Sequence, residues 1–180
     1  MKKTVLICGF IAGLISTSLF IGLMLLGKAG QDDFKHGMIY GYTLMILAFS
    51  LIFVGTRITR DKYSGGAISF GKAFRVGLYI TLIASTMYVI VWLIDYYFFI
   101  PDFAEKYGAH ILEKLKASGA SQAEITKQTA EMARFSQMYK NPLFNALLTY
   151  SEILPVGLIV SLISALVLKR KKTDAFAAAA

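Results

Sequence analysis

The sequence predicts an all-α polytopic membrane protein, with four transmembrane helices and an extracytoplasmic helical hairpin between helices three and four. Hydrophobic residues make up 56% of the 180 residues, above the roughly 45–50% of soluble domains. They gather in four runs long enough to cross a bilayer core of about 30 Å. We expect one domain over residues 1–172, with spans at about 5–26, 38–55, 74–99 and 143–168 and a hairpin at 102–141.

The first run follows Lys2 and Lys3, as the apolar region of a signal peptide also does. Such a region is about 7–15 residues long, whereas this run covers residues 5–26. We therefore expect a retained helix. Gly9 and Gly13 have the small-xxx-small spacing that lets a neighbouring backbone approach closely.

The connection between runs two and three, residues 57–75, is basic and contains the break Ser64-Gly65-Gly66. Ser69 is the expected N-cap of the third helix. The polar residues of that helix recur at spacings of four and three, which places them on one face directed at the other helices. They are Thr81, Ser85, Tyr88, Trp92 and Asp95.

Residues 102–141 are the only sizeable soluble segment. An apolar residue at every fourth position predicts an amphipathic helix over 102–117, and Ser118-Gly119 ends it. Ser121 and Glu124 form a capping box that opens a second helix. We expect a hairpin that packs on the bundle as a local lid.

The fourth run carries an acid, Glu152, and a proline, Pro155. Proline has no N–H, so the Ser151 carbonyl loses its partner on the next turn and the helix is predicted to break there. The small residues Gly157, Ser161 and Ser164 form a stripe. At about 100° per residue, Glu152 lies well off that stripe and should face another neighbour.

The basic residues predict the orientation. The N-terminus, the second connection and the segment after the fourth run carry two, five and four of them, whereas the first connection carries two. The long hairpin carries six, which are spread out and offset by five acids. The positive-inside rule then places both termini in the cytoplasm. Asp95 and Glu152 fall in the same, outer half of the bilayer, near Lys35, His36 and Lys140.

This convergence defines a candidate polar site, because acids inside a membrane are functional candidates by default. Two readings stay open. In the structural reading, Asp95 reaches headgroup water and Glu152 pairs with Lys35, His36 or Lys140. In the functional reading, the site consists of Glu152, Asp95, Ser151, Pro155, Tyr88, Trp92 and His36.

The sequence contains no catalytic or cofactor motif, so we expect a non-enzymatic protein without a cofactor. The histidines, His36 and His110, do not form a metal-spaced pair, and Cys8 is the single cysteine. The net charge of +8 does not indicate nucleic acid, because the basic residues flank apolar runs.

Nearly the whole chain resembles a bacterial membrane family catalogued as domain of unknown function 4199. The resemblance rests on Arg60-Asp61, Gly65 to Phe74, Asp102-Phe103 with Tyr107, Glu152 to Ile159 and Ser161 to Ala165. It implies a four-helix protein of the bacterial inner membrane and implies no activity. Residues 173–180 depart from the pattern and are treated as an added tail.

Two functions of different class stay open. The first is a non-enzymatic scaffold, assembly or partner-regulating subunit, with the lipid bilayer and a membrane-protein partner or a second copy around it. The second is a small ion- or proton-coupled carrier that uses Glu152 in a helix broken by Pro155. The sequence places polar residues mainly in the outer half of the bundle, which favours the first.

Overall fold

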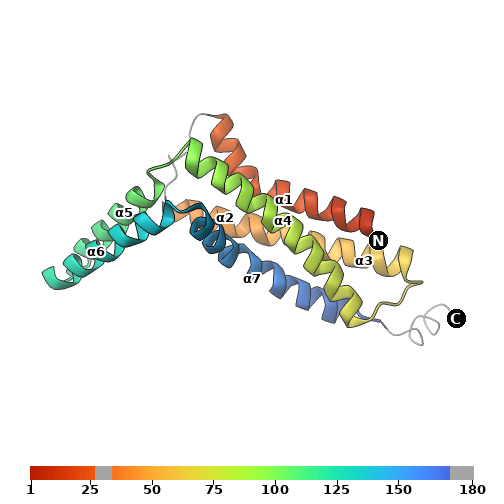
Figure 1. The fold of residues 1–180 in the computed structure, drawn as a ribbon. Coiled ribbons are helices and arrows are strands. Elements are labelled where there is room, and N and C mark those ends of the chain that lie inside the picture. Colours follow the sequence, from red (N-terminus) through yellow and green to blue (C-terminus); the bar gives the residue numbers. More distant parts are fainter. Residues whose placement is uncertain (27–33, 171–180) are drawn as a thin grey trace.

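The computed structural model describes residues 1–26 and 34–170, and of residues 34–38 only the backbone. This part of the chain forms a helical bundle from which a hairpin of two helices projects at one end (Figure 1). In order, the elements are α1 (Lys2–Leu25), α2 (Phe34–Phe49), α3 (Leu51–Tyr63), α4 (Phe70–Phe98), α5 (Phe103–Ala117), α6 (Gln122–Tyr139) and α7 (Pro142–Leu168).

Four helical stretches are long and apolar enough to cross a membrane: Lys2–Leu25, Ile39–Tyr63, Phe70–Phe98 and Pro142–Leu168. The all-α class and the four spans are thereby confirmed. Helices α2 and α3 together make the second span. They are separated only at Ser50, whose hydroxyl donates to the Leu47 carbonyl at 2.6 Å.

The predicted end of the second span, near residue 55, is wrong, because the helix continues to Tyr63. Its last turns are amphipathic. Thr56 and Thr59 are fully buried, while Arg57 and Arg60 lie beside Asp61, with Nε–carboxylate distances of 3.8 and 2.7 Å. These charged side chains therefore lie on a continuing helix, with the Arg57 side chain 73% exposed and the Arg60 side chain 18% exposed.

The connection that remains is short. Gly65 and Gly66 have φ values of 62° and 79°, a left-handed region that favours glycine. Ser69 caps α4, as predicted, by accepting a hydrogen bond from the Lys72 amide at 3.4 Å. Ile68 pairs with Arg170 in an antiparallel bridge. We call this end of the bundle the bridge end, and the other, where α4 meets α5, the hairpin end.

Helix α4 is the centre of the bundle and packs against α1 and α7 along most of its length. Its predicted polar face is confirmed as buried, with every member 8% exposed or less. Gly9 and Gly13 serve this packing, since a Cβ at either would press into Ile83 or Met87 of α4. The small-xxx-small spacing therefore brings two helices of one chain together.

Helix α7 runs without interruption through Pro155, so the predicted break is absent. A proline removes one backbone hydrogen bond, and packing against neighbouring helices keeps such a helix continuous. The small-residue stripe is buried as predicted. Ser161 Oγ lies 3.2 Å from Thr81 Oγ1 of α4 and donates to the Gly157 carbonyl at 2.7 Å.

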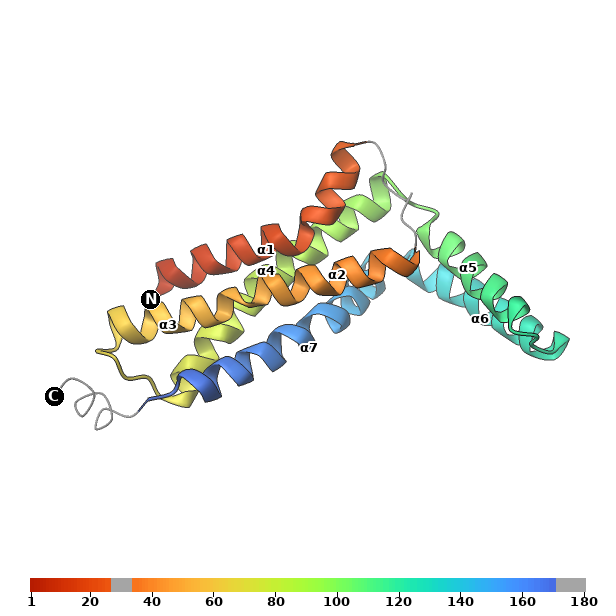
Figure 2. The same cartoon turned by 180° about the vertical axis from the view of Figure 1, so that it is seen from behind.

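Helices α5 and α6 pack against each other as a hairpin, and the capping box that opens α6 is present. Ser121 Oγ accepts from the Glu124 amide at 3.3 Å, and the Glu124 carboxylate accepts from the Ser121 amide at 2.9 Å. The hairpin points away from the bundle in both views (Figures 1 and 2). Only its base lies against the bundle, so the expected lid is limited to that base.

Candidate functional site

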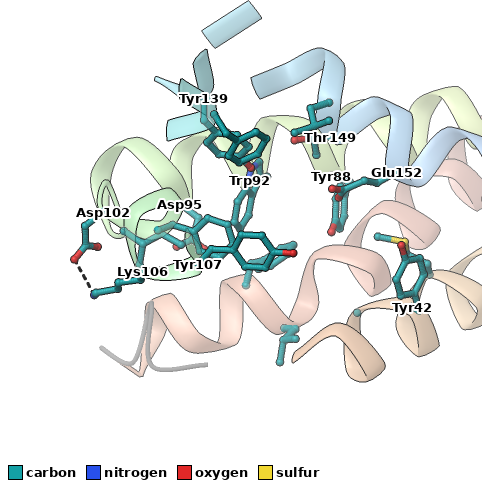
Figure 3. A pocket seen from close by; sticks show the side chains of 18 of the residues that line it. Tyr42, Tyr88, Trp92, Asp95, Asp102, Lys106, Tyr107, Tyr139, Thr149 and Glu152 are labelled. Carbon is teal, nitrogen blue, oxygen red and sulfur yellow. Dashed lines mark hydrogen bonds and ion pairs between the residues drawn. The ribbon is translucent and has the colours of Figure 1, made fainter. Parts of the chain in front are cut away.

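A cavity of about 490 Å³ lies at the hairpin end, where six helices contribute to its wall. Figure 3 shows it from close by. Most of the wall is apolar or aromatic, and four side chains bring formal charge. The lining residues are Leu19, Phe20, Gly41, Tyr42, Met45, Tyr88, Trp92, Asp95, Ile100, Asp102, Phe103, Lys106, Tyr107, Met132, Phe135, Tyr139, Leu148, Thr149 and Glu152.

Helix α1 reaches the cavity after a bend in its second half, visible in both overall views. The hydroxyls of Ser16, Thr17 and Ser18 donate to carbonyls three or four residues earlier, at 2.8–3.0 Å. Such back-bonding often bends helices. Phe20 follows the bend, and its ring centroid lies 5.4 Å from that of Tyr88 and 5.3 Å from that of Trp92.

Trp92 is held in one orientation from three elements. Its indole Nε1 donates to Tyr139 Oη of α6 at 3.0 Å and to Asn145 Oδ1 of α7 at 3.1 Å. Thr149 Oγ1 donates to the Asn145 carbonyl at 2.8 Å. The ring of Phe103 meets that of Trp92 edge-on, with centroids 4.9 Å apart. The aromatic wall is thus preorganised by hydrogen bonds inside an apolar environment.

Tyr139 joins the hairpin to this wall. Its side chain is buried, and this burial raises the pKa of the phenol above its ordinary value. The hydroxyl therefore stays protonated at neutral pH and accepts from Trp92 as a neutral group. The ring also packs edge-on against Tyr96, at 5.1 Å between centroids.

The two predicted acids both line the cavity, at different places. Asp95 is only 4% exposed, which argues against the structural reading in which it reaches headgroup water. Glu152 is exposed to the cavity. In Figure 3, Trp92 lies between Asp95 and the pair formed by Glu152 and Tyr88. Tyr88 and Asp95 are two turns apart on α4, which corresponds to roughly 10 Å.

The basic side chains near the cavity have other partners. Lys106 Nζ lies 2.8 Å from the Asp102 carboxylate. Lys140, one of the predicted partners of Glu152, instead contacts Glu105 at 3.2 Å. The other two, Lys35 and His36, belong to the residues whose side chains the structure does not describe.

The structure brings together four of the seven predicted site residues, namely Glu152, Asp95, Tyr88 and Trp92. Ser151 and Pro155 lie on exposed parts of α7 outside the cavity wall. The Ser151 hydroxyl donates to the Leu148 carbonyl at 2.6 Å. The side chain of His36 lies outside the described residues.

The sequence did not predict that residues of the hairpin helices α5 and α6 line the cavity. Phe103 and Tyr107, on the predicted amphipathic helix over 102–117, line the cavity together with Phe135 and Tyr139 of α6. The available signal was their position, since they occupy the hairpin turns nearest to the membrane spans. Asn145 was also missed, because a single amide in an apolar run shows no periodicity.

The wall is mainly apolar and aromatic, with a few polar groups, so it suits contact with an apolar molecule better than coordination of an ion. Among the described residues, no group of three or more His, Cys, Asp or Glu side chains is placed to hold a metal ion. The two ends of the wall differ in charge, with Glu152 at one end and the Asp102–Lys106 pair at the other.

A protein-family model described as "Protein of unknown function (DUF4199)" matches residues 7–170. The match covers most of the chain, including three spans in full and the first from residue 7 onward. The chain therefore belongs to this family. No curated protein and no solved structure matches it.

Proposed function

We propose that this member of the DUF4199 family is a non-enzymatic membrane protein that binds a small, mainly apolar molecule in the cavity beneath the base of the hairpin. The observation that supports it is the aromatic wall. Trp92 is positioned by hydrogen bonds from α6 and α7 and by ring contacts with α1 and α5. Cavities lined by apolar and aromatic groups with a few placed polar groups are typical of small-molecule sites.

The hairpin supplies the second part of the proposal. Its base lines the cavity, while the rest projects from the bundle (Figure 1). A bound molecule therefore contacts an element that a partner subunit can also reach. This arrangement supports a partner-regulating or assembly role, in which occupancy of the cavity is communicated through α5 and α6.

We also propose that the protein lies in the bacterial inner membrane, with both termini cytoplasmic and the hairpin outside. The basic residues near Lys2, in the Arg57–Arg75 segment and near Arg170 support this orientation. A reporter fused after Lys172 should behave as cytoplasmic, and one inserted at Gly119 as extracytoplasmic. The reverse pair of results would invert the orientation.

The binding role is tested by native mass spectrometry of protein extracted from the producing cell's membranes. Wild-type protein should retain a bound small molecule. Leu148→Trp adds an indole to the cavity wall and should abolish its retention. Ile163→Trp adds the same group to the outer, 47% exposed face of α7 and should retain the molecule as wild type does.

Absence of any retained mass from wild type, or equal retention by Leu148→Trp, would contradict the binding role. The non-enzymatic part of the proposal has its own readout. The retained molecule should be recovered chemically unchanged after incubation with the protein. If wild type converted the retained molecule to a product and Leu148→Trp did not, the protein would be an enzyme.

The carrier remains a second candidate because of one observation. The expectation that polar side chains gather at the hairpin end is wrong for the buried hydroxyls, which continue along α4 and α7 to Ser85, Thr81, Ser161 and Ser164. A proton path from Glu152 along these groups predicts pH-driven proton uptake into vesicles that contain the protein. Glu152→Gln should remove this uptake, and equal uptake by both proteins would exclude Glu152 as the carrier group.

A further inference from the structure

We infer that the molecule bound in this cavity is an organic cation, with an ammonium group beside Glu152 and an apolar body against the aromatic wall. This inference rests on the proposed binding function and specifies its ligand class. It follows from three features of the cavity: the ring faces, the position of an acid among them, and the pairing of the neighbouring lysine.

The rings supply the surface for the apolar body. Phe20, Tyr88 and Trp92 come from two adjacent helices, with centroid distances of 5.3 and 5.4 Å from Phe20 to the other two. Phe103 closes the wall from the hairpin side. Aromatic faces carry negative potential and attract cations, and recognition of quaternary ammonium groups is a common use of such walls.

Glu152 supplies the charge. Its side chain lines the cavity next to Tyr88 in Figure 3, and it forms no ion pair or hydrogen bond with any residue that the structure describes. A carboxylate in a membrane span is costly without a counter-charge. A cation in the cavity provides that counter-charge, whereas an anion adds repulsion.

The lysine in the wall does not reverse this preference. Lys106 is paired with Asp102 at 2.8 Å, so these two charges cancel locally. Both also lie at the hairpin side of the cavity, across Trp92 from Glu152 in Figure 3. The Glu152 side of the cavity therefore combines one carboxylate with aromatic faces.

An ammonium group fits this side better than a metal ion. Ca²⁺ takes six to eight oxygen ligands and Mg²⁺ an octahedron of oxygens. Around Glu152 the described wall offers mostly rings, with the hydroxyls of Tyr88 and Thr149. An alkylated ammonium needs no such ligand shell, since its charge is spread over carbon-bound hydrogens that lie well against ring faces.

Two sources can provide this chemistry. One is a soluble organic cation, and the other is a lipid with a choline or ethanolamine headgroup. Either one can present an ammonium group to the cavity at the hairpin end. The experiment therefore uses a bilayer that lacks both headgroups. A separate arm adds back the choline headgroup as phosphatidylcholine.

Trp92 is the only tryptophan of the chain, so its fluorescence reports on this wall alone. The full-length protein is placed in phosphatidylglycerol nanodiscs and titrated with benzyltrimethylammonium or with neopentylbenzene, its uncharged isostere. We expect a saturable change in Trp92 fluorescence, with the cation binding about tenfold more tightly than the isostere, as one favourable charge contact of about 1.4 kcal/mol implies.

The variants test the role of Glu152. Glu152→Gln should weaken benzyltrimethylammonium binding about tenfold and leave neopentylbenzene binding unchanged. Glu152→Asp retains the charge and should still bind the cation. It therefore shows that weaker binding by Glu152→Gln comes from loss of the charge and not from a folding defect. Glu113→Gln removes an exposed acid of α5 that does not line the cavity and serves as the matched control for net charge.

Equal affinity for the cation and its isostere would overturn the inference while leaving a binding cavity in place. No fluorescence change with either probe would contradict the binding function as well. In the lipid arm, half of the phosphatidylglycerol is replaced by phosphatidylcholine. Weaker apparent binding of the soluble cation there than in discs diluted equally with an uncharged glycolipid identifies the lipid headgroup as the occupant, and equal binding in the two discs identifies a soluble cation.

Discussion

At the bridge end, α4 and α7 touch through glycines and hydroxyls, whereas at the hairpin end rings and a cavity lie between the helices. A Cβ on Gly157 would press into Thr81 and lie 2.9 Å from the ring of Phe49, and one on Gly77 would lie 2.8 Å from Ser161 Cβ. A Cβ on Gly41, in the cavity wall, meets no atom within 4 Å.

Side-chain size therefore separates the part of this membrane bundle that packs closely from the part that has room for a bound molecule. Lipid tails are as apolar as the side chains, so helices in a bilayer associate through close packing and buried polar contacts. Small residues allow that packing at the bridge end. At the hairpin end, Phe20, Tyr88 and Trp92 keep the helices apart, and hydrogen bonds to Trp92 fix the space that results.

The largest expected effect is at the close contact. Gly157→Ala should destabilise the bundle by roughly 3 kcal/mol, within the range for overpacking of a filled core, because Thr81 and Phe49 must both move. Unfolding in mixed micelles with increasing sodium dodecyl sulfate measures this.

Gly41→Ala is the matched control, since it adds the same methyl group in a membrane helix but beside the cavity. It should change the unfolding free energy by less than about 0.5 kcal/mol, as substitutions away from packed contacts usually do. If the two glycine variants were equally stable, the distinction between a packed end and an open end would fail.

A smaller loss is expected from the hydrogen bonds that fix the aromatic wall. Asn145→Leu removes one acceptor of Trp92 Nε1 while Tyr139 keeps the other, and it should cost roughly 1 kcal/mol, the net worth of one buried hydrogen bond. Thr81→Val, which removes the hydroxyl contact to Ser161 at the bridge end, should cost about 0.6 kcal/mol.

The two variants also differ in their spectra. Asn145→Leu should shift the emission of Trp92, because the indole N–H loses a partner, while Thr81→Val should leave it unchanged. A Trp92 spectrum unaffected by Asn145→Leu would show that Tyr139 alone holds the indole.

The packed end follows from the sequence more directly than the cavity does. Hydropathy places the four spans, and spacing alone identifies the buried face from Thr81 to Asp95, because both depend on local pattern. The end of the second helix follows less directly, since Arg57 and Arg60 indicate a loop although the helix continues to Tyr63.

The cavity could not be derived in this way, because it depends on where distant segments meet. Phe20 and Tyr139 are far apart in the chain, and both contact Trp92. Glu152 and Asp95 were identified as unusual from their surroundings. That Lys140 pairs with Glu105 rather than Glu152 depends on the angle of the hairpin, which no sequence pattern specifies.

The hairpin should respond only locally. Ser121→Ala removes the N-cap of α6 and should cost about 1 kcal/mol, seen as faster amide exchange in α6 with unchanged exchange in α4. Hydrogen bonds from Ser121 lower the pKa of Glu124 below 4.5. Their stabilisation is therefore present above that pH and is lost as the pH falls through the lower folded value.

Added protease should cut this hairpin first near Ser118 to Ser121, at its exposed tip. Protection at the tip, with cleavage elsewhere in the hairpin, would show that a partner covers it. Wild type and Ser121→Ala should share the first cleavage site, and the variant should be cut faster.

The smallest expected effect on stability is at Glu152, although it is the residue on which the ligand inference depends. Its side chain faces the cavity and has no ion pair among the described residues, and Lys140 is engaged by Glu105. Glu152→Gln breaks no contact with a described residue, so it should not lower the detergent melting temperature. Breaking a buried ion pair instead costs about 3–5 kcal/mol. A drop of that size would place a cation of the protein itself beside Glu152, and the carboxylate would then no longer be available to an organic cation.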